Sequence, residues 1–128
     1  MLFHKKLYLD DEISKDKRKI ISKLKHNKLT FNVYVMVLSD SECDQLEIYP
    51  SYVLLQKIYK EKELMVVGLA SEMGSAKDLL VKMTEDCLRE TGNVSLKEYL
   101  VRWRAYPSLR SRYAHILLEK TYFLFFLL

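Results

Sequence analysis

Two short, continuously apolar runs constrain the fold of this chain more than any other feature. The segments VYVMVL, Val33–Leu38, and MVVGL, Met65–Leu69, contain no charged residue and are rich in β-branched side chains. Strands covered on both faces have this composition, whereas a strand with one solvated face alternates apolar and polar residues. We therefore predict two neighbouring buried strands, with Leu80, Met83 and Leu100 in the core.

The rest of the chain reads as further strands and helices. Apolar residues at helical spacing among lysines predict a basic amphipathic helix, and a mixed apolar pattern at the N-terminus suits an edge strand. The predicted strands cover 2–9, 29–39, 45–49 and 64–70. The predicted helices cover 12–26, 53–62, 75–91, 95–106 and a last segment from 108 onward.

The order of these elements predicts the fold class. The order strand, helix, strand, strand, helix, strand matches the ferredoxin-like split βαβ arrangement, βαββαβ, and further helices follow it. A chain of 128 residues is long enough for one domain with a sizeable core. We expect a single α+β domain over 1–128, in which 94–128 form a helical C-terminal extension.

Composition and residue spacing give little indication of catalysis. Cys43 and Cys87 provide neither a disulfide framework nor a metal-ligand spacing, and His4, His26 and His115 fall in different predicted elements. No nucleophile motif or acid–base pair is recognisable, so we lean against an enzyme and expect no cofactor and no metal. The cysteine usage is typical of a reducing cytoplasm.

The stretch around Gly68 and Gly74 raises the question of a phosphate-binding loop. A P-loop requires a lysine directly after its second glycine and then Ser or Thr, whereas Ser75, Ala76 and Lys77 follow Gly74 here. The surviving hypothesis is a weak anion site at Gly74 and Ser75, at the first turn of the helix predicted there. The alternative is an ordinary capped turn between a strand and a helix.

Basic residues gather in two places. Residues 1–28 hold nine Lys and Arg against four acids, a net charge of +5. In the second cluster, RWRAYPSLRSRY, arginines alternate with aromatic residues, a mixture typical of nucleic-acid-binding proteins. The candidate nucleic-acid-binding residues are Lys15, Arg18, Lys19, Lys23, Arg102, Arg104, Arg110 and Arg112. Alternatively, these side chains form the solvated faces of ordinary helices.

A resemblance covers Leu54–Leu100, where a strand ending in GLA precedes an acidic helix, a TG stop and a helix beginning near a YL pair. This pattern resembles short uncharacterised proteins of anaerobic Gram-positive bacteria. No activity is assigned to such proteins, so the resemblance implies no functional residue.

The C-terminal tail, YFLFFLL, is predicted to be an association surface. It is too short to span a membrane, which takes about 20 apolar residues. Consecutive large apolar side chains point all around a helix, so docking on the chain's own core would leave part of them exposed. The residues expected to associate are Phe123, Phe125, Phe126 and Leu127, between two copies of the chain.

Together these features favour a non-catalytic binding or self-associating module. The first alternative is an RNA- or DNA-binding protein that uses the basic helix over 12–28 and the Arg/aromatic segment over 102–113. The second is a small enzyme with an anion site at the 68–75 turn.

Overall fold

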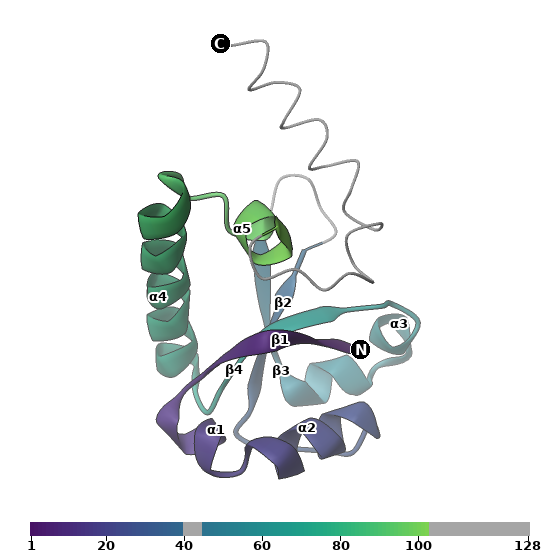
Figure 1. The fold of residues 1–128 in the computed structure, drawn as a ribbon. Coiled ribbons are helices and arrows are strands. Elements are labelled where there is room, and N and C mark those ends of the chain that lie inside the picture. Colours follow the sequence, from purple (N-terminus) through teal and green to yellow (C-terminus); the bar gives the residue numbers. More distant parts are fainter. Residues whose placement is uncertain (40–44, 103–128) are drawn as a thin grey trace.

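The protein is a mixed α+β structure built on one four-stranded sheet (Figure 1). The computed structural model describes residues 1–39 and 45–102. The strands are β1 (Leu2–Leu9), β2 (Tyr34–Leu38), β3 (Leu46–Pro50) and β4 (Met65–Ala70). Their order in the sheet is β1-β4-β2-β3, with β1 parallel to β4 and the other two pairings antiparallel.

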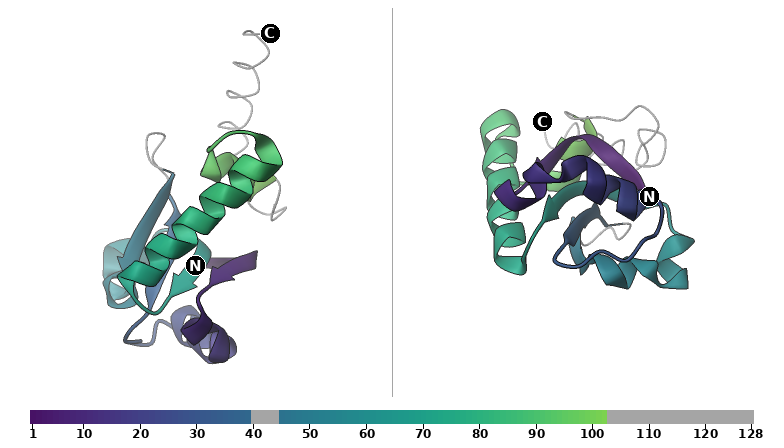
Figure 2. Two further views of the ribbon diagram at one scale, coloured as in Figure 1. Left: turned by 90° about the vertical axis from the view of Figure 1, so that its left-hand side faces the viewer. Right: turned by 90° about the horizontal axis from the view of Figure 1, so that it is seen from below.

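Helices cover both faces of this sheet, as the views in Figures 1 and 2 show. The helical elements are α1 (Asp11–Lys15), α2 (Lys17–Lys25), the 3₁₀-helix η1 (Ser51–Leu55), α3 (Lys57–Lys60), α4 (Met73–Thr91) and α5 (Leu96–Arg102). One core cluster lies between the sheet and α4 and α5, and a second joins the opposite face to α1, α2 and η1. Side chains of β2 alternate between the two, because Met36 and Leu38 belong to the first cluster and Val35 and Val37 to the second.

The predicted pair of buried strands is confirmed. β2 and β4 lie side by side in the sheet, with Val35 opposite Leu69, and all six residues of β4 are buried. Met83 and Leu100 are buried in the first cluster, and Leu80 packs against it while remaining partly exposed. Because both faces of these strands are covered, their residues need no polar alternation.

The predicted ferredoxin-like order is not confirmed. The two strands farthest apart in the sequence, β1 and β4, pair in parallel, and β1 lies at one edge of the sheet.

The predicted helix over 53–62 is also wrong in detail. Gln56 has extended backbone angles between η1 and α3, and this divides the segment into two short pieces. Likewise Asp16, with φ −123° and ψ 28°, separates α1 from α2 within the predicted helix over 12–26.

The glycine in β4 is explained by packing. A Cβ atom at Gly68 would lie 3.0 Å from Sδ of Met36, 3.0 Å from Cε of Met83 and 3.2 Å from the carbonyl oxygen of Tyr8. Glycine lets these neighbours approach the strand closely, and a side chain at this position would force them to shift. Gly92 has φ +76° directly after Thr91, so the chain leaves α4 through the left-handed conformation that glycine adopts without strain.

Candidate ligand pocket

The carboxyl ends of the parallel strands β1 and β4 lie at the same end of the sheet. Asp10 follows β1 and Ser71 follows β4. The Asp10 carboxylate accepts hydrogen bonds from the Ile13 amide at 2.8 Å, the Ser71 amide at 2.6 Å and the Ser71 hydroxyl at 2.6 Å. This carboxylate therefore caps α1 and fixes the start of the connection from β4 to α4.

The surroundings of Asp10 favour its charged form. Burial disfavours ionisation of this carboxyl, but the hydrogen bonds from Ser71 and Ile13, with a further one from the Ser75 side chain, outweigh it. The pKa of Asp10 is accordingly lowered from its ordinary value of 3.8. Asp10 is thus a poor proton acceptor at neutral pH, and its role is to fix backbone.

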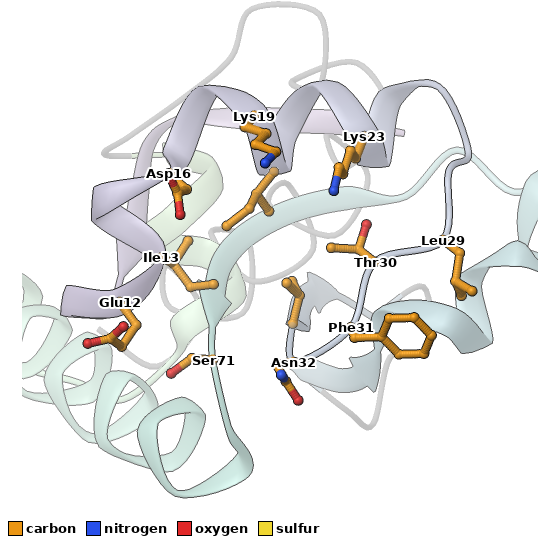
Figure 3. Close-up of a pocket in the computed structure, with 12 residues that line it drawn as sticks. Glu12, Ile13, Asp16, Lys19, Lys23, Leu29, Thr30, Phe31, Asn32 and Ser71 are labelled. Atoms are coloured by element: carbon orange, nitrogen blue, oxygen red, sulfur yellow. The ribbon is translucent and has the colours of Figure 1, made fainter.

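Beside this junction lies a pocket of about 540 Å³ between α1, α2 and the segment over 29–33 (Figure 3). Its volume falls within the range of small-molecule sites, roughly 300–1,000 Å³. The residues that line it are Glu12, Ile13, Asp16, Lys19, Ile20, Lys23, Leu29, Thr30, Phe31, Asn32, Val33 and Ser71.

The segment over 29–33, which forms one wall of the pocket, is hydrogen-bonded to Ser51 at two positions. The Ser51 hydroxyl donates to the Thr30 carbonyl at 2.6 Å, and the Ser51 amide donates to the Val33 carbonyl at 2.9 Å. Between these two anchors, Asn32 has a left-handed φ of 55° and Phe31 is 72% exposed. An exposed Phe side chain forgoes about 1.5–3 kcal/mol of burial. A fixed loop that presents such a side chain therefore suits contact with a partner molecule.

The opposite wall carries two lysines. Lys19 and Lys23 lie one turn apart on α2, and their ammonium groups point into the pocket in Figure 3. Among the described residues, neither Lys19 nor Lys23 forms an ion pair, whereas Lys15 of α1 pairs with Glu12. Both charges are thus available to an anionic ligand.

A carboxylate faces the same pocket. Asp16 is the N-cap residue of α2 but makes no capping hydrogen bond with its side chain, and its oxygens point into the cavity in Figure 3. Aspartate at this position normally caps the helix. An Asp16 side chain that faces the cavity instead is available to a ligand.

The predicted anion residues lie elsewhere. α4 begins at Met73 with Glu72 as its N-cap, so the predicted helix start near Ser75 is wrong. Ser71, which is bound to Asp10, follows the end of β4 at Ala70, and α4 begins two residues later at Met73. A Cβ atom at Gly74 would have its nearest neighbour, Oε1 of Glu72, at 3.8 Å, so no close approach of backbone requires this glycine.

The predicted nucleic-acid-binding residues are only partly brought together. Lys19 and Lys23 share the pocket, Arg18 is exposed on α2 outside it, and Lys15 pairs with Glu12 at 3.1 Å. Arg102 is the last residue of α5. The predicted residues that lie outside the described part of the chain are Arg104, Arg110, Arg112, Phe123, Phe125, Phe126 and Leu127.

Several pocket residues were missed by sequence reasoning. The segment over 29–33 was predicted as the start of a strand, but β2 begins at Tyr34. Asn32 could have indicated that the strand begins after 29–33. Asparagine tolerates the left-handed backbone conformation, which interrupts a strand. No local sequence pattern predicts the contact between Asp10 and Ser71, because the parallel pairing of β1 with β4 brings the two residues together.

Among the described residues, no group of three or more His, Cys, Asp and Glu could hold a metal ion. In the same part of the chain, no helix is long and apolar enough to cross a membrane. Comparison with known proteins found no matching family model, no similar curated protein and no similar solved structure. The resemblance of 54–100 to short bacterial proteins therefore stays a prediction.

Proposed function

We propose that this protein is a non-catalytic binding module whose pocket between α2 and the segment over 29–33 takes a small ligand with an anionic group. The observation that carries the proposal is the pair of ammonium groups, Lys19 and Lys23, that point into one pocket without an ion-pair partner among the described residues. Buried or half-buried apolar side chains beside them, such as Ile13 and Ile20, exclude water from part of the ligand and strengthen the electrostatic attraction.

The chemistry of the lining favours binding over catalysis. The pocket residues include neither histidine nor cysteine. The Ser71 hydroxyl donates to Asp10, whose pKa is lowered, so this carboxylate is a weak base for activating the hydroxyl. The arrangement can hold an anion and an apolar group.

The test is a titration followed by two-dimensional NMR, with acetate, phenylacetate and inorganic phosphate as probes. We expect saturable shifts of the amides of Lys19, Lys23 and Phe31. The shifts should be lost when both pocket lysines are changed, in K19Q/K23Q, and retained in the control K17Q, which removes one exposed charge of the same helix outside the pocket. No saturable binding of any probe to the wild-type protein, or equal binding to K19Q/K23Q, would overturn the proposal.

Nucleic-acid binding is the second candidate, favoured by the exposed ring of Phe31 on the wall that faces Lys19 and Lys23. Single strands are bound by stacking on aromatic side chains beside a basic groove. Electrophoretic mobility shift with RNA and single-stranded DNA at two salt concentrations tests this candidate, because phosphate contacts make the affinity fall steeply with salt. The absence of a shift at low salt would eliminate it.

Self-association through the C-terminal tail is a separate part of the same proposal. The tail lies outside the described residues, so its support is the sequence pattern alone.

A further inference from the structure

The charges around the pocket are sorted by sign along its length. Glu12 and Asp16 line the end formed by α1, and Lys19 and Lys23 line the part formed by α2 (Figure 3). A pocket for a simple anion has no use for carboxylates, because they repel it. The presence of both signs in one cavity indicates a ligand with both signs.

The two carboxylates differ in how well they are neutralised. Glu12 pairs with Lys15 at 3.1 Å on the exposed surface of α1. Asp16 has no ion-pair partner among the described residues and makes no capping hydrogen bond. Asp16 is therefore the carboxylate available to a cationic group of the ligand.

Apolar side chains lie between and beside these charges. Ile13, Ile20 and Val33 line the pocket, and the exposed side chains of Leu29 and Phe31 extend its loop wall. A ligand that lies between the two charged regions must therefore carry apolar groups of its own to match this surface.

The positions of the charges on the chain set the length of the ligand. Lys19 and Lys23 follow Asp16 by three and seven residues, which at 1.5 Å rise per helical residue is about 4.5 and 10.5 Å along α2. An extended dipeptide separates its ammonium and carboxylate by roughly 6–7 Å, at 3.3–3.6 Å per residue. A single amino acid has both groups on one carbon, and this separation is shorter than the spacing of Asp16 and Lys23 along α2.

From this geometry we infer that the pocket binds a small zwitterion of dipeptide length with apolar side chains. Its ammonium pairs with Asp16, its carboxylate pairs with Lys19 and Lys23, and its side chains lie on Ile20, Val33 and the loop wall. The inference rests on the proposed anion-binding function and adds the cationic subsite and the length.

The experiment measures binding of four probes to the full chain by calorimetry and NMR titration. The probes are leucyl-phenylalanine, its N-acetyl derivative, its C-terminal amide and free leucine. We expect leucyl-phenylalanine to bind best, and each of the other three to bind about tenfold more weakly, since each loses one charge-assisted contact or cannot span the site.

Variants assign each end of the dipeptide. In D16N, the free and N-acetyl dipeptides should bind equally, whereas D11N, which removes an exposed carboxylate outside the pocket, should keep the wild-type preference. In K19Q/K23Q, the free dipeptide and its amide should bind equally. Circular dichroism of each variant shows that the fold is retained.

Three outcomes overturn the inference while leaving anion binding intact: acetate or phosphate binds and the dipeptide does not, the N-acetyl form binds as well as the free dipeptide, or free leucine binds as well as the dipeptide. A preference for the free dipeptide that persists unchanged in D16N also overturns it. If neither the dipeptide nor any simple anion binds, the proposed function itself fails.

Discussion

At the residue scale, the Asp10 carboxylate joins two segments that are distant in the sequence. It accepts from the backbone of α1 and from both the amide and hydroxyl of Ser71. We predict that Asp10→Asn lowers the free energy of unfolding at neutral pH by about 1–2 kcal/mol, because hydrogen bonds to a charged acceptor are roughly twice as strong as neutral ones. Asp11→Asn, at an exposed neighbouring position, is the control and should change stability by less than about 0.5 kcal/mol.

The pH dependence of this effect has a definite sign. The pKa of Asp10 is lowered in the folded protein relative to its ordinary value of 3.8, so its stabilising contribution is complete above that value. It is lost as the pH falls through the lower pKa of the folded state. Urea unfolding of the wild type and D10N at a series of pH values should therefore show the difference between them shrinking below about pH 4. A difference that stays constant into strong acid would contradict the assignment.

The candidate site is the part of the molecule that the sequence predicted least. Lys19 and Lys23 were identified through the charge of their helix, but their inward direction depends on α2 ending beside the segment over 29–33. The position of Phe31 depends on two hydrogen bonds from Ser51, which is about twenty residues further along the chain, and no local pattern encodes that contact. Pocket geometry is a tertiary property, whereas charge and periodicity are local ones.

At the scale of elements, two glycines of the same predicted turn have opposite roles. Gly68 lies in β4 against Met36, Met83 and the backbone of Tyr8, whereas Gly74 lies in the first turn of α4 with free space around it. We predict that Gly68→Ala destabilises the protein by about 1–3 kcal/mol through overpacking. Gly74→Ala should stabilise it by about 0.5 kcal/mol, because alanine lowers the entropy of the unfolded chain.

Chemical denaturation of the two variants beside the wild type measures both effects. Each variant is the control for the other, because both replace a glycine with alanine in the same short stretch of the chain. If Gly74→Ala destabilised the protein as strongly as Gly68→Ala, the packing explanation for Gly68 would be contradicted, because a Cβ atom at Gly74 meets no close neighbour.

The elements themselves were predicted where one local pattern decided the outcome. Continuous apolar runs located β2 and β4, and the predicted helix over 75–91 ends at the same residue as α4. The strand order β1-β4-β2-β3 does not confirm the predicted ferredoxin-like order, because the order depends on which strand edges pair, and no local pattern encodes the pairing of β1 with β4. The break of the 53–62 helix was missed as well, since the apolar residues of η1 keep helical spacing while Gln56 adopts an extended conformation.

At the scale of the whole molecule, the remaining prediction concerns the apolar tail over 121–128. Side chains on both faces of β2 and β4 belong to core clusters of the described residues, so these central strands offer no open apolar face. Each Leu or Phe that is buried contributes about 1.5–3 kcal/mol, and contiguous exposed apolar patches beyond a few hundred Å² are unusual on monomers. We therefore predict a homodimer joined through Phe123, Phe125, Phe126 and Leu127.

Static light scattering across a dilution series decides this prediction. The full-length protein should show twice the monomer mass at high concentration, and a form that ends at Lys120 should remain monomeric at every concentration. A second variant, F125D/L127D, keeps the chain length and should also be monomeric, because two buried charges without partners disfavour an apolar interface. A full-length monomer at all concentrations would refute the prediction. A dimer that persists in both variants would place the interface elsewhere on the molecule.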